Sequence, residues 1–160
     1  MGQQQLLLVI LVTIIVGIAT VVAINTFGTA ADQANIDAVN NDIATLASAA
    51  QGFYMRPEML GGGGRSFDAE DGVSFEGLSF AASDIGGENN RTAVNENGRY
   101  IIDDVTADSF TIYAYPSSGV GYEPGIDGAN GSGEITAAVG PNSFELGATG
   151  EPESGNGDPS

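Results

Sequence analysis

The sequence predicts an α+β chain, with a long N-terminal helix whose second half packs under a small antiparallel β-meander of three to four strands. Three observations carry this prediction. Leu6–Ile24 is an unbroken run of 19 uncharged and mostly apolar residues. From Ile36 to Phe53 apolar residues recur at helical spacing. After Arg99 the pattern changes to short segments of alternating apolar residues, as in half-buried antiparallel strands.

The apolar run of Leu6–Ile24 is long enough to cross the hydrocarbon core of a bilayer as a helix. It is apolar on every side, so it does not resemble the one-sided helix of a soluble domain. A removable secretory signal would carry basic residues before the run and a small-residue cleavage site after it, and neither is present. We therefore expect residues 1–28 to stay in the mature protein, as the half that lies in a membrane or a filament core.

Residues 29–54 form the amphipathic half of the predicted helix. Its apolar stripe has spacings of 3, 4, 3, 4 and 3 residues and consists of Ile36, Val39, Ile43, Leu46, Ala50 and Phe53. Read as one helix, residues 3–54 would be roughly 75 Å long at 1.5 Å per residue. The residues that follow are too few to cover such a rod, so its N-terminal half is expected to project bare. A membrane anchor followed by a separate stalk is the alternative, although no Pro- or Gly-rich linker separates the two halves.

Residues 55–98 are predicted to form a glycine-rich loop region. Pro57 and the run Gly61–Gly64 end the helix and are expected to open a flexible connection. Only two short pieces of this region look like strands, Val73–Phe75 and Leu78–Phe80.

The β-meander is predicted within residues 99–146, and residues 147–160 form an acidic Gly/Pro tail. The expected strands are Tyr100–Val105, Ser109–Tyr115, Glu134–Val139 and Phe144–Leu146. The apolar face of the meander needs a cover, and the helical stripe is the available one. The residues expected in the core between helix and sheet are Ile36, Val39, Ile43, Leu46, Phe53, Ile101, Phe110 and Ile112.

Composition disfavours several classes of function. The chain has no Cys and no His, and four Arg are its only basic side chains against 21 acidic residues, for a formal charge of −17. We expect no disulfide, no catalytic site, no metal site and no cofactor. The acidic segments Asp68–Glu76 and Asp127–Glu134 lack the spacing of an EF-hand. The charge also disfavours nucleic acid as a partner. Asn90 and Asn130 begin N-glycosylation sequons, so either is a possible glycosylation site.

A short polar start, an apolar half-helix, an amphipathic second half and an antiparallel meander together resemble type IV pilins and pseudopilins. The specific part of the resemblance covers about residues 1–30, and Tyr100–Pro116 and Ile135–Val139 resemble the pilin sheet more weakly. In that family a leader is cut off by a prepilin peptidase, and the new N-terminus is methylated. The resemblance places Met1 at that N-terminus, with Gln3 as the alternative first residue.

The chain departs from the family pattern at two points. The fifth mature residue is usually Glu, which pairs with the α-amino group of a neighbouring subunit, whereas here it is Gln5, after Gln3 and Gln4. These amides would accept hydrogen bonds without neutralising charge, or serve only as an interfacial polar cap. The family's mid-helix Pro is also missing. Gly17 or Gly28 is then the expected place for the helix to unwind or bend.

The resemblance implies a major pilin, the structural subunit of an extracellular type IV pilus-like filament of many identical copies. The expected filament core includes Leu6, Ile10, Ile14, Ile18 and Val22. Its implied partners are a prepilin peptidase, an assembly ATPase and membrane platform proteins, and the chain would lie in the inner or cytoplasmic membrane before assembly. Adhesion, motility, uptake and scaffolding remain open. The alternatives are a minor pilin or pseudopilin, a surface protein that never polymerises, and an archaeal adhesive or flagellar subunit, whose outer domain would be a β-sandwich.

Overall fold

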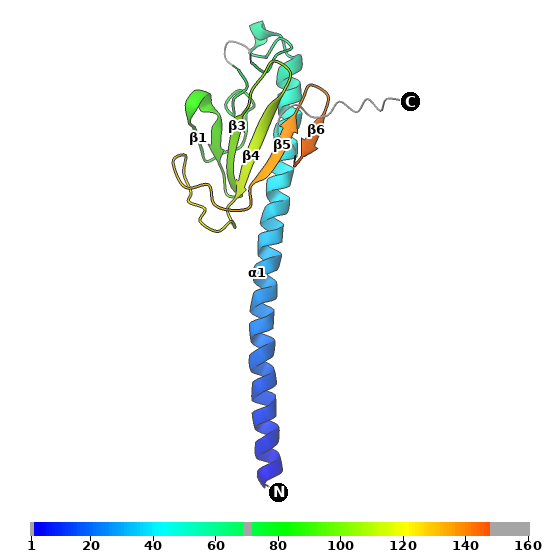
Figure 1. Cartoon of the computed structure of the whole chain (residues 1–160), viewed down its shortest axis with the longest axis vertical. Coiled ribbons are helices and arrows are strands. Elements are labelled where there is room, and N and C mark those ends of the chain that lie inside the picture. The colour runs from blue at the N-terminus through cyan, green and yellow to red at the C-terminus, as the bar shows by residue number, and fades with distance from the viewer. Residues whose placement is uncertain (1, 69–71, 148–160) are drawn as a thin grey trace, which may run out of the picture. The chain divides into compact units, whose positions relative to one another are not determined.

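The computed structural model describes residues 2–68 and 72–147. Met1 and most of the predicted acidic tail, residues 148–160, lie outside the described residues, as do positions 69–71 in the first acidic segment. The chain divides into two compact units, residues 1–34 and 35–160, called unit 1 and unit 2 below. The helix α1, Gly2–Met55, supplies all the described residues of unit 1 and the first element of unit 2 (Figure 1).

Unit 2 contains one six-stranded antiparallel sheet with strand order β1-β2-β3-β4-β5-β6. Each strand pairs with the next one along the chain, which makes the sheet a meander (Figure 1). The strands are β1 (Asp84–Gly86), β2 (Thr92–Val94), β3 (Gly98–Asp103), β4 (Phe110–Pro116), β5 (Ile135–Val139) and β6 (Phe144–Leu146). Two short 3-10 helices, η1 (Glu58–Leu60) and η2 (Glu88–Asn90), lie in the connections.

The α+β class is confirmed, and the prediction of three to four strands is wrong. The two additional strands, β1 and β2, lie in the region expected to be a loop, whereas the strand-like pieces at 73–75 and 78–80 form no strand. β1 and β2 have three residues each, which is too short to show a period of two in the sequence. They form through pairing instead, β2 with β3 and β1 with β2.

The core of unit 2 lies between the second half of α1 and one face of the sheet. The stripe residues Val39, Ile43, Leu46 and Phe53 are buried, as expected. Phe110 and Ile112 of β4 are buried in the same cluster. Each large apolar side chain in this core stabilises the fold by about 1.5–3 kcal/mol.

Two of the expected core residues are placed differently. Ile36 is half-buried and lies outside the core cluster, near the end of the part of α1 that the sheet covers. Ile101 is also half-buried, and its neighbours Tyr100 and Ile102 face the core in its place. Side chains alternate between the two faces of a strand. A prediction that is wrong by one residue therefore assigns a side chain to the opposite face of the sheet.

The connection after α1 is a packed turn, which corrects the expectation of a flexible linker. The amide N–H of Gly63 donates to the carbonyl of Phe53 at 2.9 Å, and that of Arg65 donates to the carbonyl of Tyr54 at 2.9 Å. A Cβ at Gly62 would lie 2.2 Å from the carbonyl oxygen of Arg56. The glycines therefore permit the chain to fold back closely on the end of the helix.

Candidate functional site

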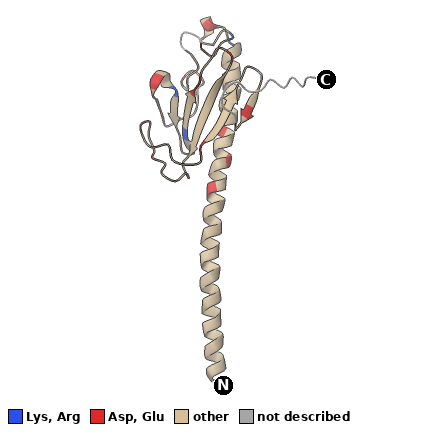
Figure 2. Cartoon of the chain, viewed as in Figure 1, with Lys and Arg blue, Asp and Glu red and all other residues tan. Residues whose placement is uncertain are grey.

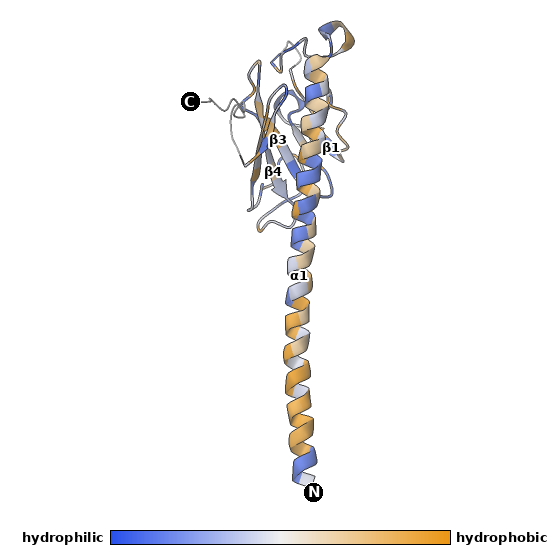
Figure 3. Cartoon of the chain, turned by 90° about the vertical axis from the view of Figure 1, so that its right-hand side faces the viewer, coloured by the Kyte–Doolittle hydropathy of each residue, from blue (hydrophilic) through white to orange (hydrophobic). Residues whose placement is uncertain are grey.

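From Gly2 to Ala31, unit 1 presents an apolar helical surface with no charged side chain. The first charged residue of the chain is Asp32, and every described residue from Gly2 to Ala34 is exposed. Figure 2 shows no acidic or basic residue over the N-terminal part of α1, and Figure 3 shows hydrophobic residues around it. Leu6, Ile10, Ile14, Ile18 and Val22, the predicted filament-core residues, are all on this surface. A surface of this size and kind is typical of a helix whose partner is lipid or other apolar helices.

The hydroxyl groups on this surface are satisfied within the helix. Thr13 donates to the carbonyl of Ile10 at 2.8 Å, and Thr20 donates to that of Val16 at 2.8 Å. A third threonine, Thr26, makes the same kind of bond further along α1. Unpaired hydroxyl groups are costly in an apolar medium. These internal bonds therefore allow the threonines to face lipid or protein without an outside partner.

The N-terminal glutamines cap the apolar surface with polar groups. Gln3, Gln4 and Gln5 are exposed in the first turn of α1, which contains no acidic residue. The side-chain amides can meet the unpaired N–H groups that every helix start leaves. Met1 lies outside the described residues, so its role in processing stays a prediction.

The helix is continuous through both glycines at which we expected it to unwind. α1 is helical from Gly2 to Met55, including Gly17 and Gly28. In a single chain, an interruption would leave backbone N–H and C=O groups unpaired. That loss outweighs the disadvantage of about 1 kcal/mol that Gly has against Ala in a helix. The expectation is wrong for the single chain, and for an assembled filament it stays a prediction.

By length and composition, α1 is the one helix among the described residues that could cross a membrane. Like other helices of this kind, its apolar surface has two environments open to it. It can lie in lipid, or it can pack against copies of itself through van der Waals contacts.

The two sequons have different surroundings. Asn90 is exposed in η2, with a φ of 53°, and its amide donates to Glu76 at 2.9 Å. Asn130 is half-buried, and its Oδ1 accepts a hydrogen bond from Arg99 at 2.6 Å. Glycosylation of either residue stays a prediction, with Asn90 the more accessible of the two.

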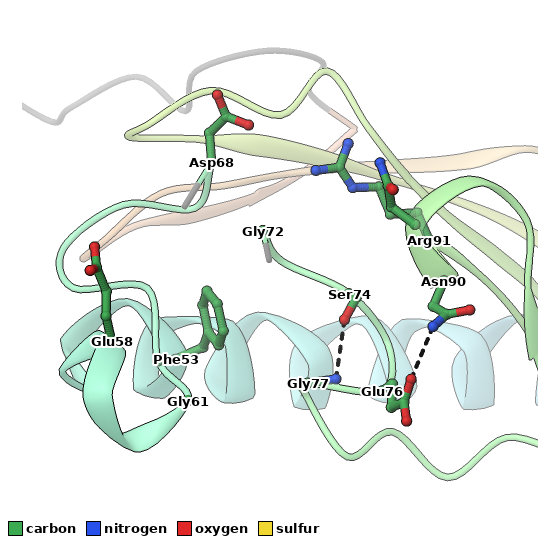
Figure 4. A pocket seen from close by; sticks show the side chains of 12 residues that line it. Phe53, Glu58, Gly61, Asp68, Gly72, Ser74, Glu76, Gly77, Asn90 and Arg91 are labelled. Carbon is green, nitrogen blue, oxygen red and sulfur yellow. Dashed lines mark hydrogen bonds between the residues drawn. The ribbon is translucent and has the colours of Figure 1, made fainter. Parts of the chain in front are cut away.

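A polar cleft of about 870 Å³ lies in unit 2. Phe53 of α1 stands at its floor, and Glu58, Asp68, Glu76 and Arg91 supply its charged side chains (Figure 4). Among the described residues, no three His, Cys, Asp or Glu side chains lie close enough to hold a metal ion. The described residues that line the cleft provide neither a nucleophile with a partnering base nor an apolar pocket, and we assign the cleft no chemistry.

Two charged residues that bind partners inside unit 2, the half-buried Asp42 and the buried Arg99, could not be identified from the sequence. Asp42 of α1 accepts hydrogen bonds from three side chains of the sheet, among them Tyr100. Burial and the bond to Asp42 raise the pKa of Tyr100 above its usual range. Arg99 is 1% exposed and donates to groups of the loop between β4 and β5. For Arg99, the one signal in the sequence was a lone basic residue directly before the predicted strand Tyr100–Val105.

No family model, no curated protein and no solved structure matches this chain.

Proposed function

We propose that this chain is the structural subunit of a type IV pilus-like helical filament. The observation that carries the proposal is the charge-free apolar surface of α1 from Leu6 to Ile24, which belongs to the same helix that enters the α+β unit, unit 2. A helix of this kind cannot stay in water alone. Leaving one large apolar side chain exposed costs about 1.5–3 kcal/mol, and 18 residues between Leu6 and Ile24 are hydrophobic or threonine.

In the proposed cycle, the apolar half of α1 first lies in the inner or cytoplasmic membrane, with unit 2 outside. Assembly then transfers the helix into a bundle of identical helices. Lipid contacts are replaced by packing of Leu, Ile and Val, a change that has no hydrophobic driving force of its own. The transfer therefore calls for an ATP-driven machine and membrane platform proteins. Once outside the membrane, hydrophobic burial makes dissociation into water very unfavourable.

The architecture of unit 2 supports a pilin over the archaeal alternative. The described residues form a single antiparallel sheet laid on one helix. A β-sandwich, with two packed sheets, was the arrangement that would have favoured an archaeal adhesive or flagellar subunit. The extracellular location, and roles in adhesion or motility, belong to the proposal.

A minor pilin or pseudopilin is the second candidate, and Gln5 is the observation that favours it. Without the usual acidic residue, the chain lacks the charge pair expected to set the register of a major subunit. Abundance separates the two candidates. A major subunit dominates the protein sheared from the cell surface, whereas a minor subunit is rare there.

The experiment compares Ile10→Asp with Ile10→Leu in cells that carry the assembly machinery. Ile10→Asp puts a charge into the apolar surface and should abolish filaments seen by electron microscopy, because an unpaired charge is strongly disfavoured in an apolar core. Ile10→Leu keeps the volume and the apolar character, so normal filaments are expected. Normal filaments from Ile10→Asp, or none from the unmodified chain, would contradict the proposal.

A further inference from the structure

Positive charge on this acidic chain is concentrated in one exposed place. The only basic side chains are the four Arg residues. Arg99 is buried, and Arg91 is half-buried, with its Nε donating to the carbonyl of Val73 at 3.3 Å. Arg56 and Arg65 are both exposed. Because two acidic surfaces repel each other, an attractive contact between copies of this chain is best made through these two side chains.

Arg56 and Arg65 lie together with exposed apolar side chains at the C-terminal end of α1. Two backbone bonds bring the turn onto the helix end, from Gly64 N–H to the carbonyl of Arg56 at 3.0 Å and from Arg65 N–H to that of Tyr54 at 2.9 Å. The exposed apolar neighbours are Met55 (71% exposed), Met59 (90%) and Leu60 (68%). We call Met55, Arg56, Met59, Leu60 and Arg65 the tip patch.

Helix electrostatics alone do not account for the tip patch. Cations near a helix C-terminus interact favourably with the helix dipole, which explains the position of Arg56 and Arg65. It does not explain three large apolar side chains left in water beside them. Glu58 lies in the same turn, but its side chain is directed over Gly64. Apolar groups around a pair of cations are typical of a docking surface for an acidic partner.

An acidic counterpart lies on the loop between β4 and β5, residues 117–134, which we call the acidic loop. Its side chains Glu123, Asp127 and Glu134 are exposed, and Val120 is 84% exposed. The buried guanidinium of Arg99 anchors this loop. It donates hydrogen bonds to Asn130 Oδ1 at 2.6 Å and to the carbonyls of Glu123, Gly125 and Gly128. The acidic loop is therefore anchored. Its three acidic residues are exposed, although Glu134 accepts a hydrogen bond from the Tyr115 hydroxyl at 2.6 Å and Glu123 accepts one from the Ala129 N–H at 3.4 Å.

The two surfaces lie at opposite ends of the unit 2 segment of α1. Asn35, at the start of that segment, accepts a hydrogen bond from the amide N–H of Ser118 in the acidic loop at 3.1 Å. Met55, at the other end of the segment, belongs to the tip patch. Twenty residues of helix separate Asn35 from Met55, which is about 30 Å at 1.5 Å per residue. The two surfaces of one copy therefore cannot reach each other.

We propose that the tip patch of one copy docks on the acidic loop of a second copy. Val120 would meet the Met and Leu side chains, and the carboxylates would meet Arg56 and Arg65. The contact is heterologous, so it repeats along a helical assembly without closing on itself. It rests on the proposed filament function. It is also much smaller than a standard interface, so it orients subunits while the apolar helices hold them together.

The absence of Cys from the chain makes the contact testable by disulfide formation in filaments of the full chain. The double variant Met59→Cys/Val120→Cys should give a ladder of covalent oligomers on a non-reducing gel after mild oxidation. A disulfide requires Cα atoms within about 7 Å, so the two Cys residues of one copy cannot pair. Each single variant should give no ladder. The pair Ala81→Cys/Asn142→Cys, at two exposed positions outside both surfaces, is the matched control.

Charge is tested on the same cysteine background. Arg56→Gln/Arg65→Gln should lower the cross-linked fraction several-fold, whereas Ala81→Asp/Asn142→Asp, which changes the formal charge equally, should leave it unchanged. Normal filaments without a ladder would overturn the inference and leave the filament function intact. Absence of filaments from the unmodified chain would overturn the filament function instead.

A second measurement applies if the cysteine variant does not assemble. A photoreactive side chain at position 59 should cross-link to residues 117–134 of another copy. Cross-links to other residues of the chain, to another protein, or to lipid or polysaccharide would overturn the proposal, as would filaments that give no cross-link.

Discussion

The phenol oxygen of Tyr100 donates a hydrogen bond to Oδ2 of Asp42 over 2.6 Å. Tyr100 is fully buried in β3, and Asp42 lies on α1. The same carboxylate oxygen accepts bonds from the side-chain amides of Asn95 at 2.9 Å and Asn97 at 2.8 Å. One acidic side chain of the helix is thus tied to three groups around the β2–β3 turn, which fixes the helix against the sheet.

Asp42→Ala should lower the free energy of unfolding of unit 2 by about 2–4 kcal/mol, because three donors lose a charged acceptor and the Tyr100 hydroxyl is left buried without it. All five tyrosines lie in unit 2, and the chain has no Trp, so tyrosine fluorescence during urea unfolding in mild detergent reports on this unit. Asp32→Asn, at an exposed position of unit 1, is the control and should change nothing. An equal effect of the two substitutions would contradict the role of Asp42.

Unit 2 should lose stability at alkaline pH. Burial and the bond to Asp42 raise the pKa of Tyr100. The hydrogen bond to Asp104 is the main cause that raises the pKa of Tyr113 to about 12, and burial, with the bond to Glu134, raises that of Tyr115 to about 12. The pKa of an unfolded tyrosine is about 10.

The sign follows from proton linkage. Above about pH 10 the unfolded chain loses tyrosine protons that the folded chain still holds, so the free energy of unfolding falls as pH rises. The stabilisation that comes from these raised tyrosine pKa values is complete below about pH 10 and is lost as the pH passes through about 12. Urea unfolding at a series of pH values checks this, and Tyr100→Phe should make the decline shallower. A free energy of unfolding that increases as the pH is raised beyond about 10 would contradict the raised tyrosine pKa values.

Arg99→Met should release the acidic loop. The variant removes the donors that bind Asn130 and the carbonyls of three other loop residues. Cleavage on the N-terminal side of Asp127 by an aspartate-specific protease should accelerate on the order of tenfold or more, since each hydrogen bond to a charged group contributes about 1.5–3 kcal/mol. Arg65→Met, at an exposed position, should leave the cleavage rate unchanged. Equal rates for wild type and Arg99→Met would show that the loop is held by other contacts.

Gly17→Ala separates the single chain from the filament. Nothing lies within 4 Å of a Cβ added at Gly17, and the substitution should favour the helix by about 1 kcal/mol. If assembly requires local loss of helicity there, the variant should form fewer filaments. Gly52→Ala, at another open position of α1, provides the matched control. Normal filament numbers from Gly17→Ala would remove the last support for unwinding at this residue.

The long helix and the class of fold could be predicted from the sequence because their signals are local. The uncharged run of Leu6–Ile24 and the stripe through Val39 and Ile43 each follow from the spacing of apolar residues along one element. β4 was predictable for the same reason, since its seven residues are long enough to show alternation. The exposed apolar surface of Leu6–Ile24 was identified in this way as well.

The remaining features depend on contacts between distant parts of the chain. β1 and β2 are too short to carry a pattern, and the choice of Ile101 over Ile102 was an error of one residue in the facing of β3. Arg99 is buried and Asp42 is half-buried, and the rule that charged residues lie on the surface places both wrongly. Their partners come from segments about 25 to 60 residues away, so no local pattern announces them.

In the proposed assembly, the apolar half of α1 leaves the membrane to form the core of a filament of identical chains. Helical reconstruction by electron cryo-microscopy of filaments sheared from the cell surface tests this most directly. We expect this chain to be the repeating subunit, with Leu6–Ile24 of every copy packed around the filament axis and unit 2 on the outside. Filaments built from other proteins, or a chain found only as a membrane-embedded monomer, would contradict it.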